Sequence, residues 1–564
     1  MGQTTIISPV MDQAGARDIS PLKVKDKLLI IIYGCTLLLA GLGMRTLTRH
    51  EVLAAYPAKE MLLYGHWIVP MYAGIPRTAK PPGMNWIIAA TMKIFHSESE
   101  FIVRLPSALS GVATGLMIGS FAARHYGRRI GIVSALMVMT SLYVLIQARL
   151  AESDMLLTAL VCAAMLLFAE APVAEAENES APRPFRQQLF AWQPILFYLL
   201  TGITFLLKGF VGPAFILLGT IVYSVIQRDR RAVYFLLNPL GILLLLAMVA
   251  AWPVMAYLKY PPILQSWRFE QLGRLTGERG YDPFYFYLYS IPGSLLPWTP
   301  LMIVPAWVGL KNHLYRRPIN KFFLCWFISG VILLSLSSFK HQHYAFPLLP
   351  PAAILGAIGL LQLFEHEQGN AKRYSRVVDI TLLLICLVLA ASCYFIPRTK
   401  DMAVGLTMLL GLIWWGIVCV VDALRNKDIR QTVFRLFIAT WVLCQFVFVL
   451  IMPQLDDYRA DADVARTANK LPPGTMVYII DPEPQVEPHS AWYLRPPIRR
   501  FRDVNDFLAN APLHAGEKVY VMTNTTQSKT IAIKGTVETL AERDNSLKSK
   551  RPRDLILISY VPKP

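Results

Sequence analysis

Residues 191–226 read AWQPILFYLLTGITFLLKGFVGPAFILLGTIVYSVI, two apolar runs separated only by Lys208 and Gly209. Similar runs recur along the chain, which has 564 residues, of which 54% are hydrophobic and only 16% charged. A soluble domain carries about 25% charged residues. The repeated apolar runs therefore predict an α-helical polytopic membrane protein.

The apolar runs predict about thirteen transmembrane helices. Their ranges are 27–44, 105–122, 130–148, 154–171, 191–207, 209–226, 235–258, 287–310, 321–338, 343–364, 377–396, 401–422 and 432–453. A further run, 84–96, is shorter than the about 20 residues that a helix needs to cross a bilayer. If this run lies in the interface, the basic loops, such as 228–231, all fall in the cytoplasm. We therefore expect 84–96 to be a re-entrant or surface helix.

This arrangement gives the chain a predicted sidedness. The N-terminus lies in the cytoplasm, and the first apolar run is an uncleaved signal-anchor. A membrane domain spans 1–453, and 172–188 is a cytoplasmic linker. The tail, 454–564, has a helical stretch at 503–510 and three strand-like runs, which predict a small extracytoplasmic α/β domain. The three runs are 477–480, 518–522 and 555–560.

Charge and cysteine content exclude several classes of function. The formal net charge is +18, but the basic residues lie in short loops between apolar runs, as orientation signals do, which argues against nucleic-acid binding. All seven cysteines lie inside apolar runs. With no CxxC pair or Cys/His cluster, thiol catalysis, structural zinc and a disulfide framework are not expected.

Ionisable side chains gather in five loops that this topology places on the outer face. They are His50, Glu51 and Lys80 in the first loop, Arg149, Glu152 and Asp154 in the second, Lys208 in the third, Arg268, Glu270 and Arg274 in the fourth, and Lys340, His341 and Tyr344 in the fifth. Each alone has a structural explanation, such as a helix cap for His50 and Glu51 or a snorkelling side chain for Lys208. Their shared position on one face indicates a functional site.

Several cations and a carboxylate at the outer surface suit one kind of substrate. A polyprenyl-phosphate sugar buries its tail in the lipid and leaves its phosphate at the interface. Lysines and arginines would bind that phosphate and stabilise it as it leaves with growing negative charge. A carboxylate would orient or deprotonate an acceptor, or bind a divalent metal that assists the leaving group. We therefore expect a transferase that uses a lipid-linked sugar.

The first external loop also carries an ordered series of short motifs. They are His50-Glu51, Glu60-Met61, Gly65-His66-Trp67-Ile68-Val69-Pro70, Gly74-Ile75-Pro76, Lys80-Pro81-Pro82, Trp86 and 101–107. This series resembles the aminoarabinose transferase and protein mannosyltransferase group of the GT-C glycosyltransferases. Further matches are Asp154, Lys208-Gly209, Glu270 with Arg274, Pro297-Trp298, and the turn that holds Lys340 and Tyr344.

The resemblance implies a GT-C-like membrane domain, and an undecaprenyl- or dolichyl-phosphate sugar as donor. The acceptor would be a lipid A phosphate, a glycan or a protein hydroxyl. Lys80, Arg274, Lys340 and Tyr344 occupy positions where the family handles the lipid phosphate. Lys208 is a further phosphate-binding candidate, and Glu51 and Asp154 are the acidic candidates for catalysis. Arg268, Glu270 and His341 complete the expected site.

The sequence departs from the family pattern at three positions. His50 stands where the family usually has Asp, Ala79 replaces an acidic residue, and Gln271 replaces a His. The last two changes argue against a metal site at that position. His50 would serve as the general base if its pKa lay near neutrality. Otherwise Asp154 or Glu51 acts, or the acceptor is already ionised and needs no base.

Two other classes of function fit a polytopic chain. A lipid flippase or transporter typically shows paired repeats and ionisable residues near the bilayer midplane. Here the ionisable residues form one outer layer and no internal repeat is evident, which favours the transferase. A non-catalytic scaffold that presents the tail domain would not need polar groups from five loops on one face.

Overall fold

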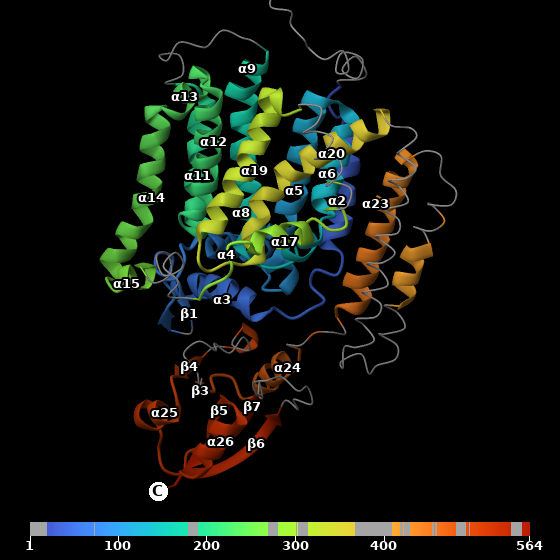
Figure 1. Ribbon diagram of the computed structural model, residues 1–564. Helices are drawn as coiled ribbons and strands as arrows, with labels where there is room; N and C mark the ends of the chain where they lie inside the picture. The colour runs from blue at the N-terminus through green and yellow to red at the C-terminus, as the bar shows by residue number, and fades with distance from the viewer. Residues whose placement is uncertain are drawn as a thin grey trace, which may run out of the picture. The chain divides into compact units, whose positions relative to one another are not determined.

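A computed structural model provides the fold (Figure 1). It describes residues 20–72, 74–178, 190–268, 280–299, 302, 314–366, 409–417, 421, 429–453, 456, 459–480, 492–495, 497–542 and 555–563. The predicted span 377–396, most of the predicted span 401–422 and residues 303–310 of the predicted span 287–310 lie outside these residues.

The chain divides into two compact units whose segments alternate along the sequence. The helical unit comprises Met1–Leu42, Thr78–Met84 and Arg104–Leu450. The sheet unit comprises Gly43–Arg77, Asn85–Val103 and Ile451–Pro564. The first external loop is therefore shared, since its middle segment, Thr78–Met84, belongs to the helical unit and its flanks to the sheet unit.

The helical unit is built from α-helices with short 3-10 and π segments. The elements are α2 (Val24–Leu39), α5 (Glu100–Tyr126, in this unit from Arg104), α6 (Arg128–Met139), α7 (Leu142–Gln147), α8 (Ser153–Phe168), η1 (Ala169–Val173), α9 (Ala174–Glu177), α11 (Trp192–Lys208), α12 (Val211–Gln227), α13 (Arg230–Leu236), α14 (Pro239–Lys259), α15 (Ile263–Trp267), α17 (Phe286–Ser294), η3 (Leu314–Arg316), α19 (Pro318–Leu336), η4 (Gln342–Leu348), α20 (Leu349–His366), α23 (Ile429–Gln445) and η5 (Phe446–Ile451). Helices α8, α11, α12 and α19 run side by side (Figure 1).

The core of this unit is apolar and rich in aromatic side chains. Phe168 of α8 lies at its centre, with its ring centroid 5.3 Å from that of Phe235 and 5.5 Å from that of Phe322. Phe197 and Tyr223 extend the cluster onto α11 and α12. Such ring pairs contribute about 0.5–1.5 kcal/mol each beyond their buried area. This packing holds α8 and α11 together, and both helices carry site residues.

In the described part of the chain, five helices are long enough and apolar enough to cross a membrane. They are Glu100–Tyr126, Ser153–Glu177, Pro239–Lys259, Pro318–Leu336 and Gln342–Leu360. Shorter apolar helices cover Trp192–Lys208, Val211–Gln227 and Phe437–Leu450. The run 84–96 forms α4 (Gly83–Phe95), which at 13 residues is shorter than a bilayer crossing.

Several expected helix boundaries are wrong; for example, α17 ends at Ser294, inside the expected run 287–310. The run 130–148 does not form one helix, because α6 ends at Met139 and α7 begins at Leu142. At the break, the amide of Leu142 donates to the carbonyl of Leu296 at 2.8 Å instead of to its own helix, and the indole Nε1 of Trp298 donates to the Thr140 hydroxyl at 2.9 Å. The linker expected at 172–188 is helical up to Glu177, through η1 and α9.

Glu177 shows why the helix continues. The guanidinium of Arg317 donates to its carboxylate, with Nε at 3.0 Å from Oε1, and the amide of Ile319 donates at 3.2 Å to Oε2. These contacts tie α9 to the start of α19. The intervening alanines and glutamates are also strong helix formers.

The sheet unit combines the flanks of the first external loop with the C-terminal segment. Its elements are α3 (Arg49–Tyr64), the hairpin β1 (Met71–Tyr72) and β2 (Ile75–Pro76), α4 from Asn85, α24 (Arg459–Ala468), β3 (Val477–Ile480), β4 (Ile498–Phe501), α25 (Val504–Asn510), β5 (Val519–Thr523), α26 (Thr525–Ala532), β6 (Gly535–Glu542) and β7 (Ile556–Pro562). The strands predicted at 477–480, 518–522 and 555–560 are confirmed as β3, β5 and β7, and the helix at 503–510 as α25.

The C-terminal strands form a five-stranded mixed sheet in the order β4-β3-β5-β7-β6. Strands β4, β3 and β5 are parallel, whereas β7 pairs antiparallel with both β5 and β6. A core of apolar side chains covers the sheet, centred on Phe507 of α25 and including Val521, Ile558 and Tyr560. Helices α24 and α26 also contact the β6–β7 end.

Candidate active site

The centre of the candidate site is an ion pair between Asp154 and Lys208. The Nζ atom of Lys208 donates to Oδ1 of Asp154, and the two side chains are only 5% and 4% exposed. Asp154 lies in the first turn of α8, and Lys208 is the last residue of α11. Each charge therefore sits at the helix end whose dipole favours it. Both residues were predicted site residues, from different loops, and the structure brings them together.

Local backbone geometry sets the position of Lys208. Gly209 follows it with φ +73°, a value that favours glycine, and its amide donates to the carbonyl of Phe205 at 2.7 Å. This turn ends α11 immediately after the lysine. Lys208 therefore lies at the C-terminal end of α11, where the helix dipole favours a positive charge.

One face of the ion pair is lined by the turn that carries Tyr344. The Nζ atom of Lys208 lies 4.7 Å from the centroid of the Tyr344 ring, which is a cation–π contact. His343 packs edge-on against Tyr344, with centroids 4.7 Å apart, and stacks on the exposed His341 at 5.0 Å. These side chains extend the site from the buried pair to the surface.

Lys80 belongs to the same cluster. Its segment approaches α11 closely, because a Cβ atom on Gly83 would lie 2.5 Å from the carbonyl oxygen of Leu206. The charge of Lys80 acts on the carboxylate of Asp154. Lys80 itself is exposed. The site thus has a buried cation paired with a carboxylate, and an exposed cation whose charge acts on that carboxylate.

Lys340 lies in the turn that precedes His341 and is only 4% exposed. Its Nζ donates to the carbonyl oxygens of Ser337 and of Asp282, the latter at 3.0 Å. Its backbone amide donates to Oδ2 of Asp282 at 2.9 Å. Two of the three N–H groups of this lysine therefore hold the turn.

Arg149, in the same loop as Asp154, has a structural role. It is 8% exposed, and its guanidinium donates to the carbonyls of Leu38, at 3.0 Å, and Ala40 at the end of α2. It also lies over the ring of Phe448, 4.1 Å from the centroid. A cation that binds the unsatisfied carbonyls at a helix C-terminus stabilises that end.

Other predicted residues belong to the sheet unit, are exposed, or fall outside the described residues. Glu51 and His50 are on α3 of the sheet unit. The Glu51 carboxylate accepts from the amide of Thr48 at 2.8 Å and forms a capping box, so the helix-cap explanation is confirmed. His50 is exposed, and Arg268 is exposed at the end of α15. Glu270 and Arg274 lie outside the described residues.

Two residues of the cluster were missed as candidates, although the sequence offered a signal for both. His343 lies in the turn that was singled out for Lys340 and Tyr344, and Asp282 precedes a proline in the fourth loop. Within the described ranges, the site gathers no group of three His, Cys, Asp or Glu side chains suited to a metal ion. The chemistry that this cluster offers is the binding of an anion by two lysines and the orientation of a polar group by Asp154.

Several known proteins are similar to this chain. The family model for dolichyl-phosphate-mannose-protein mannosyltransferases matches residues 79–257, which include Lys80, Asp154 and Lys208. An undecaprenyl phosphate-alpha-4-amino-4-deoxy-L-arabinose arabinosyl transferase of Pseudomonas fluorescens is 29% identical over 71% of this chain and 71% of its own length. Its counterpart in Pseudomonas savastanoi pv. phaseolicola is 28% identical, and the match spans 60% of this chain and 61% of that relative.

Solved structures agree on the fold. The crystal structure of ArnT from Cupriavidus metallidurans bound to undecaprenyl phosphate superposes with a TM-score of 0.76 and 19% identity, covering 94% of this chain and 97% of that one. The apo structure of the same protein gives a TM-score of 0.75. The chain is a multi-pass membrane protein with the GT-C fold, and in motifs, family model and architecture it resembles the aminoarabinose transferase and protein mannosyltransferase group of glycosyltransferases.

Proposed function

We propose that this protein is an integral membrane glycosyltransferase that moves a sugar from a polyprenyl phosphate to an acceptor outside the cytoplasm. The observation that carries the proposal is the Asp154–Lys208 pair, with Tyr344 and Lys80 beside it. The solved ArnT structure with undecaprenyl phosphate supports the lipid class of the donor. The acceptor would be a lipid A phosphate, a glycan or a protein hydroxyl.

The lysines have the main part in the proposed mechanism. The acceptor oxygen attacks the anomeric carbon, the bond from that carbon to the phosphate oxygen breaks, and the polyprenyl phosphate leaves with one more negative charge. Lys80 and Lys208 bind this phosphate and stabilise the charge that develops on it. Tyr344 lies against Lys208 and limits where its ammonium can point. A direct displacement of this kind inverts the anomeric carbon.

Asp154 positions Lys208 through their ion pair. Where the acceptor is a hydroxyl, Asp154 is also the carboxylate that takes its proton, with His50 as the second candidate. An ionised phosphate acceptor needs no base. Glu51 is assigned to capping α3 because its carboxylate is buried against Thr48. Lys340 is assigned to holding the turn that carries His341 and Tyr344. The remaining predicted residues, Arg268, Glu270 and Arg274, stay candidates for donor contacts.

The proposed topology has about thirteen spans in the bacterial inner membrane, with α4 in the interface and the N-terminus in the cytoplasm. The short length of α4 supports this count. The site and the C-terminal α/β domain, 454–564, would both lie in the periplasm. Cysteine accessibility at exposed positions, such as Lys529 on α26, tests this orientation in intact spheroplasts.

The test of function uses purified protein in nanodiscs and radiolabelled undecaprenyl-phosphate sugars, with envelope lipid and protein as acceptors. Lys80→Ala and Lys208→Ala should each lower the rate of transfer by about 100-fold or more, as the loss of one charge-stabilising donor does. Lys259→Ala, an exposed lysine at the end of α14, is the matched control and should transfer at the wild-type rate. Wild-type protein that consumes no donor, yet carries labelled lipid across proteoliposome bilayers, would make the protein a flippase instead.

A further inference from the structure

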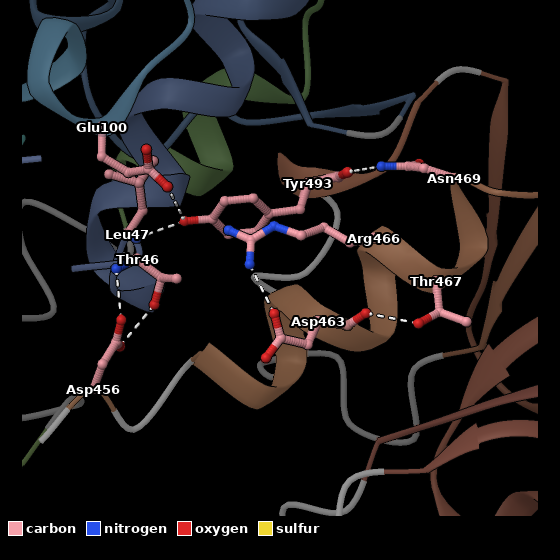
Figure 2. A network of polar contacts seen from close by, with 9 residues as sticks. All are labelled: Thr46, Leu47, Glu100, Asp456, Asp463, Arg466, Thr467, Asn469 and Tyr493. Carbon is pink, nitrogen blue, oxygen red and sulfur yellow. Dashed lines mark hydrogen bonds and ion pairs between the residues drawn. The ribbon is translucent and has the colours of Figure 1, made fainter. Parts of the chain in front are cut away.

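The C-terminal segment contacts both flanks of the first external loop through two adjacent aromatic residues, Trp492 and Tyr493. Figure 2 shows the network around Tyr493. Its hydroxyl accepts a hydrogen bond from the amide of Leu47 at 2.8 Å and donates to Oε1 of Glu100 at 3.1 Å. Leu47 lies just before α3, and Glu100 begins α5. One hydroxyl thus joins two segments that are 53 residues apart in the chain.

Tyr493 is itself held in place from the C-terminal side. The side-chain amide of Asn469 donates to its carbonyl oxygen at 2.6 Å. The guanidinium of Arg466 lies 5.6 Å from its ring centroid, and Asp463 fixes that guanidinium through an ion pair of 2.7 Å. Both charged residues come from α24 (Figure 2). The hydroxyl therefore has a defined position before it contacts the loop, which lowers the entropy cost of the contact.

Two further contacts join the same partners. Asp456 accepts from both the amide and the hydroxyl of Thr46, at 2.7 Å each (Figure 2). Lys59 of α3 forms an ion pair of 2.7 Å with Glu98, and its Nζ lies 5.5 Å from the ring centroid of the buried Trp492. The C-terminal segment thus contacts the chain before and after the segment that carries Lys80.

The order of these segments along the chain places Lys80 between the two contacted flanks. Thr78–Met84, which carries Lys80, is bounded by Gly43–Arg77 on one side and Asn85–Val103 on the other. Both flanks belong to the sheet unit, and both contact the C-terminal segment, through Leu47 and Lys59 on one side and Glu100 on the other. Fixing the two ends of a loop reduces the conformations that the residues between them can adopt.

We propose that Trp492 and Tyr493 are positioning residues for Lys80, and that the C-terminal segment thereby sets the affinity of the site for the donor phosphate. This inference rests on the proposed function in that Lys80 binds the phosphate. Loosening either flank lowers the fraction of molecules with Lys80 in the binding position. The apparent Kd for the lipid phosphate then rises in proportion.

The decisive variant is Tyr493→Phe, which removes the hydroxyl and keeps the ring under Arg466. Tyr520→Phe, on β5 of the C-terminal sheet, is the matched control. In hydrogen exchange of the full-length protein, amides at 45–52 and 98–103 should exchange roughly five- to tenfold faster in Tyr493→Phe, and at the wild-type rate in the control. Unchanged exchange in Tyr493→Phe would overturn the inference.

The second measurement is the Kd for undecaprenyl phosphate itself. It should rise roughly three- to tenfold in Tyr493→Phe. In the Lys80→Ala background, Tyr493→Phe should raise the Kd no further, because its effect passes through Lys80. An additional rise of the same size in that background would show that Tyr493 acts by another route and would overturn the inference.

Turnover then separates positioning from a folding defect. Tyr493→Phe should raise the donor KM while kcat stays within about twofold, whereas a smaller folded fraction would lower kcat at constant KM. The exchange and Kd measurements need no sugar transfer. If these results hold and no sugar is transferred, only the proposed chemistry fails. If wild type transfers sugar but Tyr493→Phe binds undecaprenyl phosphate as wild type does, only this inference fails.

Discussion

The buried Asp154–Lys208 pair predicts a specific pattern of stability in single and double variants. Removing one partner of a buried pair leaves an uncompensated charge, which costs about 3–5 kcal/mol. Lys208→Met leaves Asp154 under the charge of Lys80, so its cost should lie near about 3 kcal/mol. Asp154→Asn leaves Lys208 facing the like charge of Lys80, so its cost should lie near about 5 kcal/mol.

The double variant Asp154→Asn with Lys208→Met removes both charges and keeps the side-chain volumes. Its free energy of unfolding should therefore return to within about 1 kcal/mol of wild type. Unfolding in mixed micelles with increasing dodecyl sulfate measures the three values. Transfer activity should stay absent in the double variant, because the cation for the phosphate is gone. If the two single costs simply add in the double variant, the two charges are not paired in a low-dielectric site and the reasoning is refuted.

Three further predictions concern single residues. Arg149→Met should lower the free energy of unfolding by about 2–3 kcal/mol, because the carbonyls at the end of α2 lose a charged donor. Thermal unfolding measures this loss, with the exposed Arg129→Met as control. Lys340→Met should leave the fold intact but raise the donor KM several-fold, because the turn that positions Tyr344 loses the hydrogen bonds of the lysine. A donor KM equal to that of wild type would contradict the structural role of Lys340. The amide of Arg502 and the side chain of Asn510 hold the pKa of Asp506 below its ordinary value of 3.8. The ionised Asp506 therefore stabilises α25 above pH 3.8, and this stabilisation is lost as the pH falls below that value. Hydrogen exchange of α25 should show this acid sensitivity in wild type and not in Asp506→Asn.

Sequence reasoning found the strands that lie inside the C-terminal sheet and missed those at its edges. Strands β3, β5 and β7 are interior in the sheet order and appear in the sequence as short apolar runs. The edge strand β6 reads GTVETLAE, and β4 reads IRRF within a stretch rich in arginine. Edge strands carry polar and charged side chains because one side is unpaired, so their sequences resemble loops.

For the site, sequence reasoning located the outer-face loops but could not separate structural from functional charges. Asp154 and Arg149 lie five residues apart, and nothing in the sequence distinguishes them. The distinction depends on the end of α2, whose carbonyls bind Arg149, and on the end of α11, which brings Lys208 to Asp154. The break in 130–148 likewise involves Leu296 and Trp298, which are distant in sequence. Such pairings arise only from packing.

The alternation of the two units along the chain limits how this protein can be divided or recombined. A truncation after residue 453 would remove the partners of Thr46 and Lys59 together with the tail. A chimaera that exchanges only the C-terminal segment would place a foreign surface against the native flanks of the first loop. The exchangeable module is instead discontinuous, and consists of Gly43–Arg77, Asn85–Val103 and Ile451–Pro564 moved as a set. Relatives should therefore inherit these three segments together, with compensating substitutions across Trp492 and Lys59.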